Sequence, residues 1–159
     1  MIRAAVVTVS DRSAAGTRTD ESGPLAVAAL REAGFDCADA VVVPDGADSV
    51  ERALTAEVVA GVKLIVTTGG TGVSPRDQTP EGTMRVVTRP IPGIAEEMRR
   101  RGVDEKPAGM LTRGVAGVVD PHGVLVVNLP GSPGGVASGI SVVLSVAGHV
   151  LDQLGGGDH

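Results

Sequence analysis

The stretch KLIVTTGGTGVSPRDQTPE, residues 63–81, joins an apolar run to a loop rich in glycine, proline and charge. Residues 63–70 carry an aliphatic and β-branched run, which is typical of a strand buried on both faces of a sheet. The segment Thr79-Pro80-Glu81 offers an N-cap, a first-turn proline and an early acid, so it predicts a helix start. A buried strand that passes through a polar loop into a helix is the unit from which parallel α/β sheets are built.

The same unit recurs along the chain. Residues 4–10, 39–45 and 124–131 are rich in valine and bounded by turn residues, and we predict them as three more buried strands. A helix is predicted from residue 22 to Gly34, with proline in its first turn, and another between Asp48 and Gly61. Strands that alternate with helices in this way predict a parallel sheet with right-handed crossovers.

The rest of the chain completes one domain. Residues 79–89 and 92–102 have helical patterns, and residues 114–127 have the pattern of a hairpin with its turn at 120–123. A last helix is predicted from the apolar stripe Ile140, Val143, Leu144, Ala147, Leu151 and Leu154. We expect an α/β domain with a mostly parallel sheet and a small β-hairpin over residues 1–154, followed by a flexible tail at 155–159.

Composition narrows the classes of function. The chain has 159 residues, enough for one domain with a substantial core, and 42% of them are hydrophobic. Phe35 is the one aromatic residue, so the core must consist of valine, leucine, isoleucine and alanine. A net charge of −5 and the lack of stacking aromatics argue against nucleic-acid binding. Cys37 is alone, which excludes an internal disulfide, and its apolar surroundings predict a buried core residue.

The start of the chain, MIRAAVVTVSDR, leads directly into a strand, with no basic region followed by a long apolar stretch. No apolar run approaches the roughly 20 residues of a membrane span, so we expect a soluble, cytoplasmic protein with no membrane partner. Residues 99–101 are three arginines that follow two glutamates, and we expect them on a solvated helix face.

Three predicted strands end in polar or glycine-rich loops, SDRSAAGT at 10–17, GGTGVSPRDQTPE at 69–81 and NLPGSPGG at 128–135. The carboxyl ends of parallel strands meet at one edge of a sheet, and ligands bind in the crevice beyond that edge. The three loops should therefore converge on a single binding site.

The glycines of the central loop, Gly69, Gly70 and Gly72, permit positive φ and a close approach of a ligand to the backbone. Successive amides in such a loop can turn inward as an anion nest, and a following helix N-terminus adds to a phosphate cradle. The loop lacks the Gly-Lys-Ser/Thr of a P-loop and the third glycine of the dinucleotide motif. An ordinary turn before a well-capped helix is the alternative.

Two acids fall at the same edge, Asp77 within the central loop and Asp45 at the end of another predicted strand. An acid in an anion-binding loop repels phosphate unless a cation lies between them, and Mg²⁺ binds through one or two carboxylates plus substrate phosphates. Both acids could instead be turn residues or helix caps, as could Ser10, Asp11 and Ser132. The three histidines have no metal-ligand spacing, and the sequence has no Ser-His-Asp or Cys-His arrangement.

Seven linked motifs resemble those of the MogA/MoaB-type molybdopterin-binding family, which includes the G domain of gephyrin. In chain order they are TVSDR, DESGP, VVPD, TTGGTG with RDQTPE, PGIAEEMR, LTRGVAGV and NLPGSPGG, and the resemblance covers roughly residues 3 to 150. The resemblance implies a three-layer α/β/α fold and assembly as a homotrimer. It also implies a Mg²⁺-dependent transfer of AMP from ATP to the terminal phosphate of molybdopterin, with release of pyrophosphate.

The resemblance assigns roles to residues at the predicted edge. Asp77 and Asp45 would be catalytic and hold Mg²⁺. The nucleotide and its phosphates would be bound by Gly69, Gly70, Thr71, Gly72, Ser10 and Asp11. Molybdopterin would be bound by Pro130, Gly131, Ser132 and Arg113, with a trimer contact as the alternative role of Arg113.

Two other functions are compatible with these motifs. A MoaB-like protein would bind molybdopterin, or serve as a scaffold, without transferring AMP; Asp45 and Asp77 are both present, which favours the enzyme. Related domains also occur in molybdenum-insertion enzymes of the MoeA type and in CinA-type hydrolases, which carry additional domains. A downstream molybdenum-insertion enzyme is a further expected partner.

Overall fold

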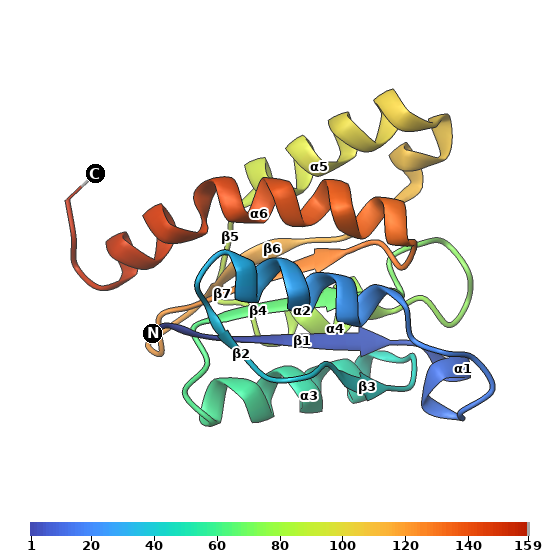
Figure 1. Cartoon of the computed structure of the whole chain (residues 1–159), viewed down its shortest axis with the longest axis horizontal. Helices are drawn as coiled ribbons and strands as arrows, with labels where there is room; N and C mark the ends of the chain where they lie inside the picture. Colours follow the sequence, from blue (N-terminus) through green and yellow to red (C-terminus); the bar gives the residue numbers. More distant parts are fainter. Residues whose placement is uncertain (159) are drawn as a thin grey trace.

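A mixed seven-stranded sheet forms the centre of the computed structural model, which describes residues 1–158 (Figure 1). β1, β4 and β7 run parallel in its middle, β2 and β3 pair in parallel with the outer side of β1, and β6 and β5 continue the other side in antiparallel register. The strands are β1 (Arg3–Val9), β2 (Asp36–Cys37), β3 (Val41–Val43), β4 (Leu64–Thr68), β5 (Arg89–Pro90), β6 (Ala116–Val119) and β7 (Val124–Leu129).

Helices cover both faces of this sheet, so the predicted three-layer α/β/α fold is confirmed (Figure 1). One face carries α2, α5 and α6, and the other carries α3 and α4. The helices are α1 (Asp11–Ala14), α2 (Ser22–Glu32), α3 (Ala47–Val59), α4 (Thr79–Met84), α5 (Pro92–Glu105), the 3₁₀ turn η1 (Pro107–Leu111) and α6 (Pro133–Leu154).

The two faces of the sheet bury two separate aliphatic clusters, as the scarcity of aromatic residues predicted. Leu30 of α2 and Val143 of α6 are fully buried on one side, and Val50 and Leu54 of α3 on the other. Complete burial of one such side chain contributes about 1.5–3 kcal/mol. Cys37 lies in the first cluster, and burial raises the pKa of its thiol, so it is a core residue as predicted.

Four local predictions need correction. The strand predicted at 39–45 is only Val41–Val43, and Val41 is 46% exposed because β3 lies at the sheet edge. The last helix begins at Pro133, earlier than its apolar stripe. Thr79 is not the cap of α4, because Gln78 precedes the helix and the buried Thr79 hydroxyl donates to the Gly69 carbonyl at 2.9 Å.

The fourth correction concerns the length of the apolar segments. By length and composition alone α6 could cross a membrane, a property that the core helices of soluble proteins share. Val136, Val143 and Ala147 of α6 are buried against the first cluster.

The predicted hairpin is confirmed by the antiparallel pairing of β6 and β7 around the turn at 120–123. Beyond α6, the amides of Gly155, Gly156 and Gly157 donate to carbonyls of residues 151–153. The last residue of the predicted tail, 159, lies outside the described residues.

Candidate active site

The loops that follow β1, β4 and β7 meet at the carboxyl edge of the sheet, as predicted. The amide of Gly69 donates to the Leu129 carbonyl at 3.1 Å. A Cβ on Gly69 would lie 2.3 Å from the Val9 carbonyl oxygen, and one on Gly131 would lie 3.2 Å from the Gly69 Cα. Glycine is therefore required because the three loops pack backbone against backbone.

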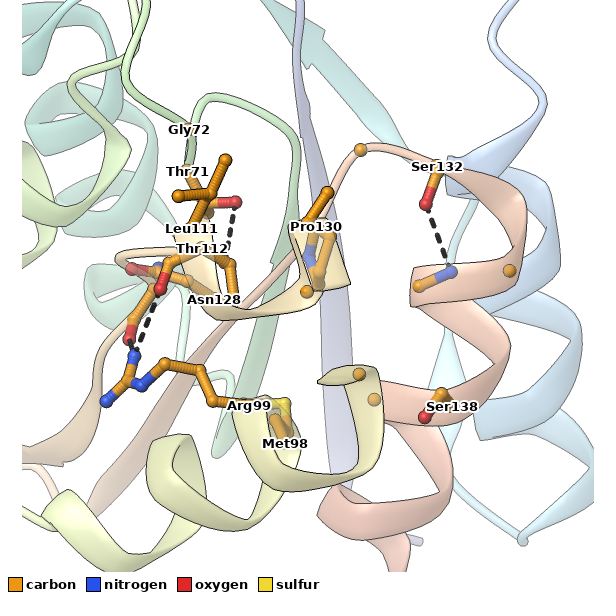
Figure 2. Close-up of a pocket in the computed structure, with 18 of the residues that line it drawn as sticks. Thr71, Gly72, Met98, Arg99, Leu111, Thr112, Asn128, Pro130, Ser132 and Ser138 are labelled. Carbon is orange, nitrogen blue, oxygen red and sulfur yellow. Dashed lines mark hydrogen bonds between the residues drawn. The ribbon is translucent and has the colours of Figure 1, made fainter. Parts of the chain in front are cut away.

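Two cavities open at this junction. The first has a volume of about 530 Å³ and lies between the central loop, the α5–η1 segment and the start of α6 (Figure 2). The second has a volume of about 360 Å³ and is bounded by the ends of β1 and β4, by Asp45 and by the start of α2. Gly70, Asp77, Gly131 and Ser132 line both cavities, so the two spaces adjoin along the glycine loops.

The predicted glycines and serines lie at these cavities. Gly69 and Gly70 have φ values of +91° and +68°, whereas Gly72 has no positive φ. Ser10 lines the second cavity and its hydroxyl caps α1 by accepting the Ser13 amide at 3.2 Å. Ser132 caps α6 by accepting the Gly135 amide at 3.1 Å (Figure 2). Thr71 and Pro130 line the first cavity.

Asp45 and Asp77 both line the second cavity, and Asp77 also reaches the first. The Ser74 amide donates to the Asp77 carboxylate at 3.0 Å, and the Asp77 amide donates to the Ser74 carbonyl at 3.0 Å. These two bonds close a tight turn that fixes the direction of the Asp77 side chain. The pKa of Asp45 is raised, chiefly by burial and further by the neighbouring charges of Asp11 and Asp77.

Asp45 and Asp77 are candidate ligands for a divalent cation. Within residues 1–158, no lysine or arginine side chain forms an ion pair with the carboxylate of Asp45 or of Asp77. The same part of the chain holds no group of three or more His, Cys, Asp or Glu residues suited to a metal. A magnesium ion here would thus depend on two carboxylates together with phosphate oxygens and water, which is its usual coordination in nucleotide sites.

Asp11 is not among the residues that line the two cavities. Its carboxylate accepts two hydrogen bonds from the Arg76 guanidinium, both at 3.1 Å, and these bonds lower the pKa of Asp11. Asp11 and Asp45 also cross-link, since each backbone amide donates to the other carboxylate, at 2.9 and 3.0 Å. Asp11 thus supports Asp45 instead of lining the predicted cleft. Arg76 was not singled out from the sequence, although its position beside Asp77 was a signal.

Arg113 also lies outside the lining of both cavities. Its guanidinium donates to the carboxylate of Glu81 at 2.8 and 3.2 Å, to the carbonyl of Gly72 at 2.8 Å and to the carbonyl of Asp77 at 2.8 Å. The residue therefore binds the central loop, and neither a pterin phosphate nor a second chain is needed to explain its contacts.

Arg99 corrects the expectation that all three neighbouring arginines lie on a solvated face. Arg100 and Arg101 do pair with Glu97, which lowers the pKa of Glu97 to about 2. Arg99 instead lines the first cavity and donates to the carbonyls of Thr112 and Gly114 at 3.3 and 3.1 Å (Figure 2). The sequence does not show that Arg99 lines the cavity, because this depends on which face of α5 meets the cavity.

Asn128, at the end of β7, is a second wall residue that sequence analysis missed. It is buried, its amide nitrogen donates to the hydroxyls of Thr67 and Thr83 at 3.0 Å, and its oxygen accepts the Val115 amide at 3.1 Å. All of these groups are satisfied, so Asn128 ties β4, α4 and the segment before β6 to the floor of the first cavity.

Residues 5–149 match the family described as "probable molybdopterin binding domain". The chain belongs to the MogA/MoaB-type molybdopterin-binding family. It is 38% identical to a "molybdenum cofactor biosynthesis bifunctional protein" of Synechococcus elongatus. The match covers 98% of this chain and 48% of that protein. It is 36% identical to a "molybdopterin adenylyltransferase" of Pyrococcus furiosus, over 92% of this chain and 87% of that protein.

Solved structures of the family agree with the fold. The molybdopterin biosynthesis Mog protein from Mycobacterium ulcerans is 46% identical, with a TM-score of 0.90 over 97% of this chain and 99% of that one. The chain spans about half the length, or less, of the first curated relatives that it matches.

Proposed function

We propose that the chain catalyses the Mg²⁺-dependent transfer of AMP from ATP to the terminal phosphate of molybdopterin. The observation that carries this proposal is the pair of adjoining cavities, which share Asp77 and the glycine loops. A transfer between two bulky substrates requires two spaces that meet at the reacting phosphates. The names of several relatives, among them that of Pyrococcus furiosus, support this activity.

The reaction needs no nucleophile from the protein. The terminal phosphate of molybdopterin is largely dianionic at neutral pH, because a phosphate monoester has a second pKa of about 6. Its oxygen forms a bond to the α-phosphorus of ATP, the bond from that phosphorus to the bridging oxygen breaks, and pyrophosphate leaves. The protein must align the two phosphates and offset their charge.

The residues at the junction are suited to these tasks. Backbone amides of Gly69, Gly70, Thr71 and Gly72 would bind phosphate oxygens, and Asp45 and Asp77 would hold magnesium. When bound, magnesium supplies positive charge that offsets the negative charge developing on the phosphates. The two hydrogen bonds of the turn at Ser74 and Asp77 orient one of these two carboxylates.

An incubation with ATP, Mg²⁺ and molybdopterin, scored for adenylylated pterin and for pyrophosphate, tests the proposal. Both products should form in equal amounts, and Asp77→Asn should largely abolish them while molybdopterin still binds. Full turnover by this variant would remove Asp77 from the mechanism. Binding of molybdopterin with no pyrophosphate released by the unmodified protein would assign the chain the MoaB-like binding or scaffold role instead.

A further inference from the structure

The guanidinium of Arg113 makes four hydrogen bonds, and each of them goes to the segment that carries Asp77. Two go to the Glu81 carboxylate in the first turn of α4, one to the Gly72 carbonyl and one to the Asp77 carbonyl. The Arg113 amide adds a bond to the Thr71 carbonyl at 2.7 Å. Both ends of the loop between residues 72 and 77 are therefore attached to a single side chain.

These attachments help to determine where the Asp77 carboxylate lies. The turn closed by Ser74 and Asp77 is joined to the rest of the fold by two arginines: Arg113, and Arg76, whose guanidinium donates to the Asp11 carboxylate and to the Asp45 carbonyl. Arg113 holds the backbone of Asp77 itself, and a Cβ on Gly72 would lie only 2.9 Å from the Asp77 carboxylate. A displacement at Gly72 or at the backbone of Asp77 would thus move the carboxylate relative to Asp45.

The Arg113–Glu81 ion pair is too exposed to contribute much to the stability of the fold. The side chains are 39% and 49% exposed, and ion pairs of this kind contribute little to the free energy of unfolding. Its geometry is more informative, because a bidentate pair orients the planar guanidinium so that its remaining N–H groups reach the loop carbonyls. Neither side chain lines a cavity, so neither is placed to contact a substrate.

We infer that Arg113 is a positioning residue, which acts with Glu81 to hold the Asp77 loop in its catalytic geometry and does not bind the pterin phosphate. This inference rests on the proposed function only for its effect on turnover. The structural part, that Arg113 fixes the loop, holds for any reaction at this site.

The decisive variants are Arg113→Lys, which keeps the charge but loses the planar fork, and Glu81→Gln, which weakens the orienting pair. Both should lower kcat for adenylyl transfer. In Arg113→Lys the loss could reach about 100-fold, because a displacement of a catalytic group by about 1 Å can have an effect of this size. The KM for molybdopterin should change by less than about threefold, because no substrate contact is removed. The double variant should lose less kcat than the product of the two single fold-losses, because both changes free the same loop.

A matched control is Arg85→Gln. Arg85 pairs with Asp48 and Glu51 on α3, is 47% exposed and has no bond to the central loop, so its loss should leave turnover unchanged. A rise in the KM for molybdopterin with kcat retained in Arg113→Lys would overturn the inference and make Arg113 a substrate ligand.

Amide hydrogen exchange separates this inference from the proposed function. In Arg113→Lys the two hydrogen-bonded amides of this loop, those of Ser74 and Asp77, should exchange about tenfold faster than in the unmodified protein or in Arg85→Gln, as expected for the loss of a charge-assisted bond. Unchanged exchange would overturn the positioning role whatever the activity. Faster exchange in a protein that shows no adenylyl transfer would support the positioning role and reject only the proposed reaction.

Discussion

At Asp45 the charge that would hold magnesium conflicts with the stability of the ligand-free fold. Its carboxylate is partly buried, near the charges of Asp11 and Asp77, and the pKa of Asp45 is raised above its ordinary value of 3.8. An acid whose pKa is raised on folding contributes stability below its unfolded pKa, and loses that contribution as pH rises through the folded value. At neutral pH the charged Asp45 therefore lowers the stability of the ligand-free fold.

We predict that Asp45→Asn raises the Tm of the ligand-free protein at pH 7. The amide oxygen can still accept the Asp11 amide, while the like charge is removed. The gain should shrink as pH falls from 7 into the acid range and Asp45 becomes protonated in the unmodified protein. Thermal unfolding across this pH range measures it, with Asp39→Asn as control, because that side chain is 97% exposed. A lower Tm at pH 7 would contradict the prediction.

The acids and glycines of the site could be predicted from the sequence because they lie in the loops that follow recognisable strands. The partners of Arg76, Arg99 and Arg113 could not. Arg113 pairs with Glu81, which is 32 residues away, and Arg76 pairs with Asp11, which is 65 residues away. Such choices depend on how distant segments lie in space, and local sequence carries no information on them.

At the scale of elements, the three strand-end loops form one packed unit with Gly69 at its centre. Gly69 has a φ of +91°, and its Cβ position would lie 2.3 Å from the Val9 carbonyl oxygen. We predict that Gly69→Ala lowers the free energy of unfolding by about 3 kcal/mol, through left-handed strain and overpacking together. Denaturant unfolding measures this change.

Gly148 provides a matched control for the same substitution. It lies within α6 with no atom within 4 Å of its Cβ position, so Gly148→Ala should stabilise the protein by about 0.5–1 kcal/mol. Equal effects of the two substitutions would mean that the close approach of the loops does not limit this position.

The sequence predicted the central strands and the hairpin well, and it was wrong where context outweighs composition. Residues 41–43 have the valine run of a central strand but pair only with β1, so their outer side faces solvent. The segment Pro133-Gly134-Gly135 has turn composition yet forms the first turn of α6, where proline is favourable.

At the scale of the whole molecule, exposed apolar side chains gather where α5 meets η1. Val103, Met110 and Leu111 are 39%, 59% and 53% exposed. This segment stands away from the sheet in Figure 1, beyond the start of α6. Apolar residues exposed together on a surface commonly mark a contact between chains, and closed symmetry is the usual arrangement of identical chains.

We therefore predict that the homotrimer implied by the family resemblance uses this segment. Light scattering coupled to gel filtration should give a mass about three times the 15.9 kDa of one chain. Met110→Glu should shift the mass toward that of one chain, because a charge would be buried in an apolar contact. Val59→Glu is the control, since Val59 is 78% exposed at the end of α3 on the other side of the sheet. A single-chain mass for the unmodified protein would contradict the trimer, and a trimer retained by Met110→Glu would place its contacts on another surface.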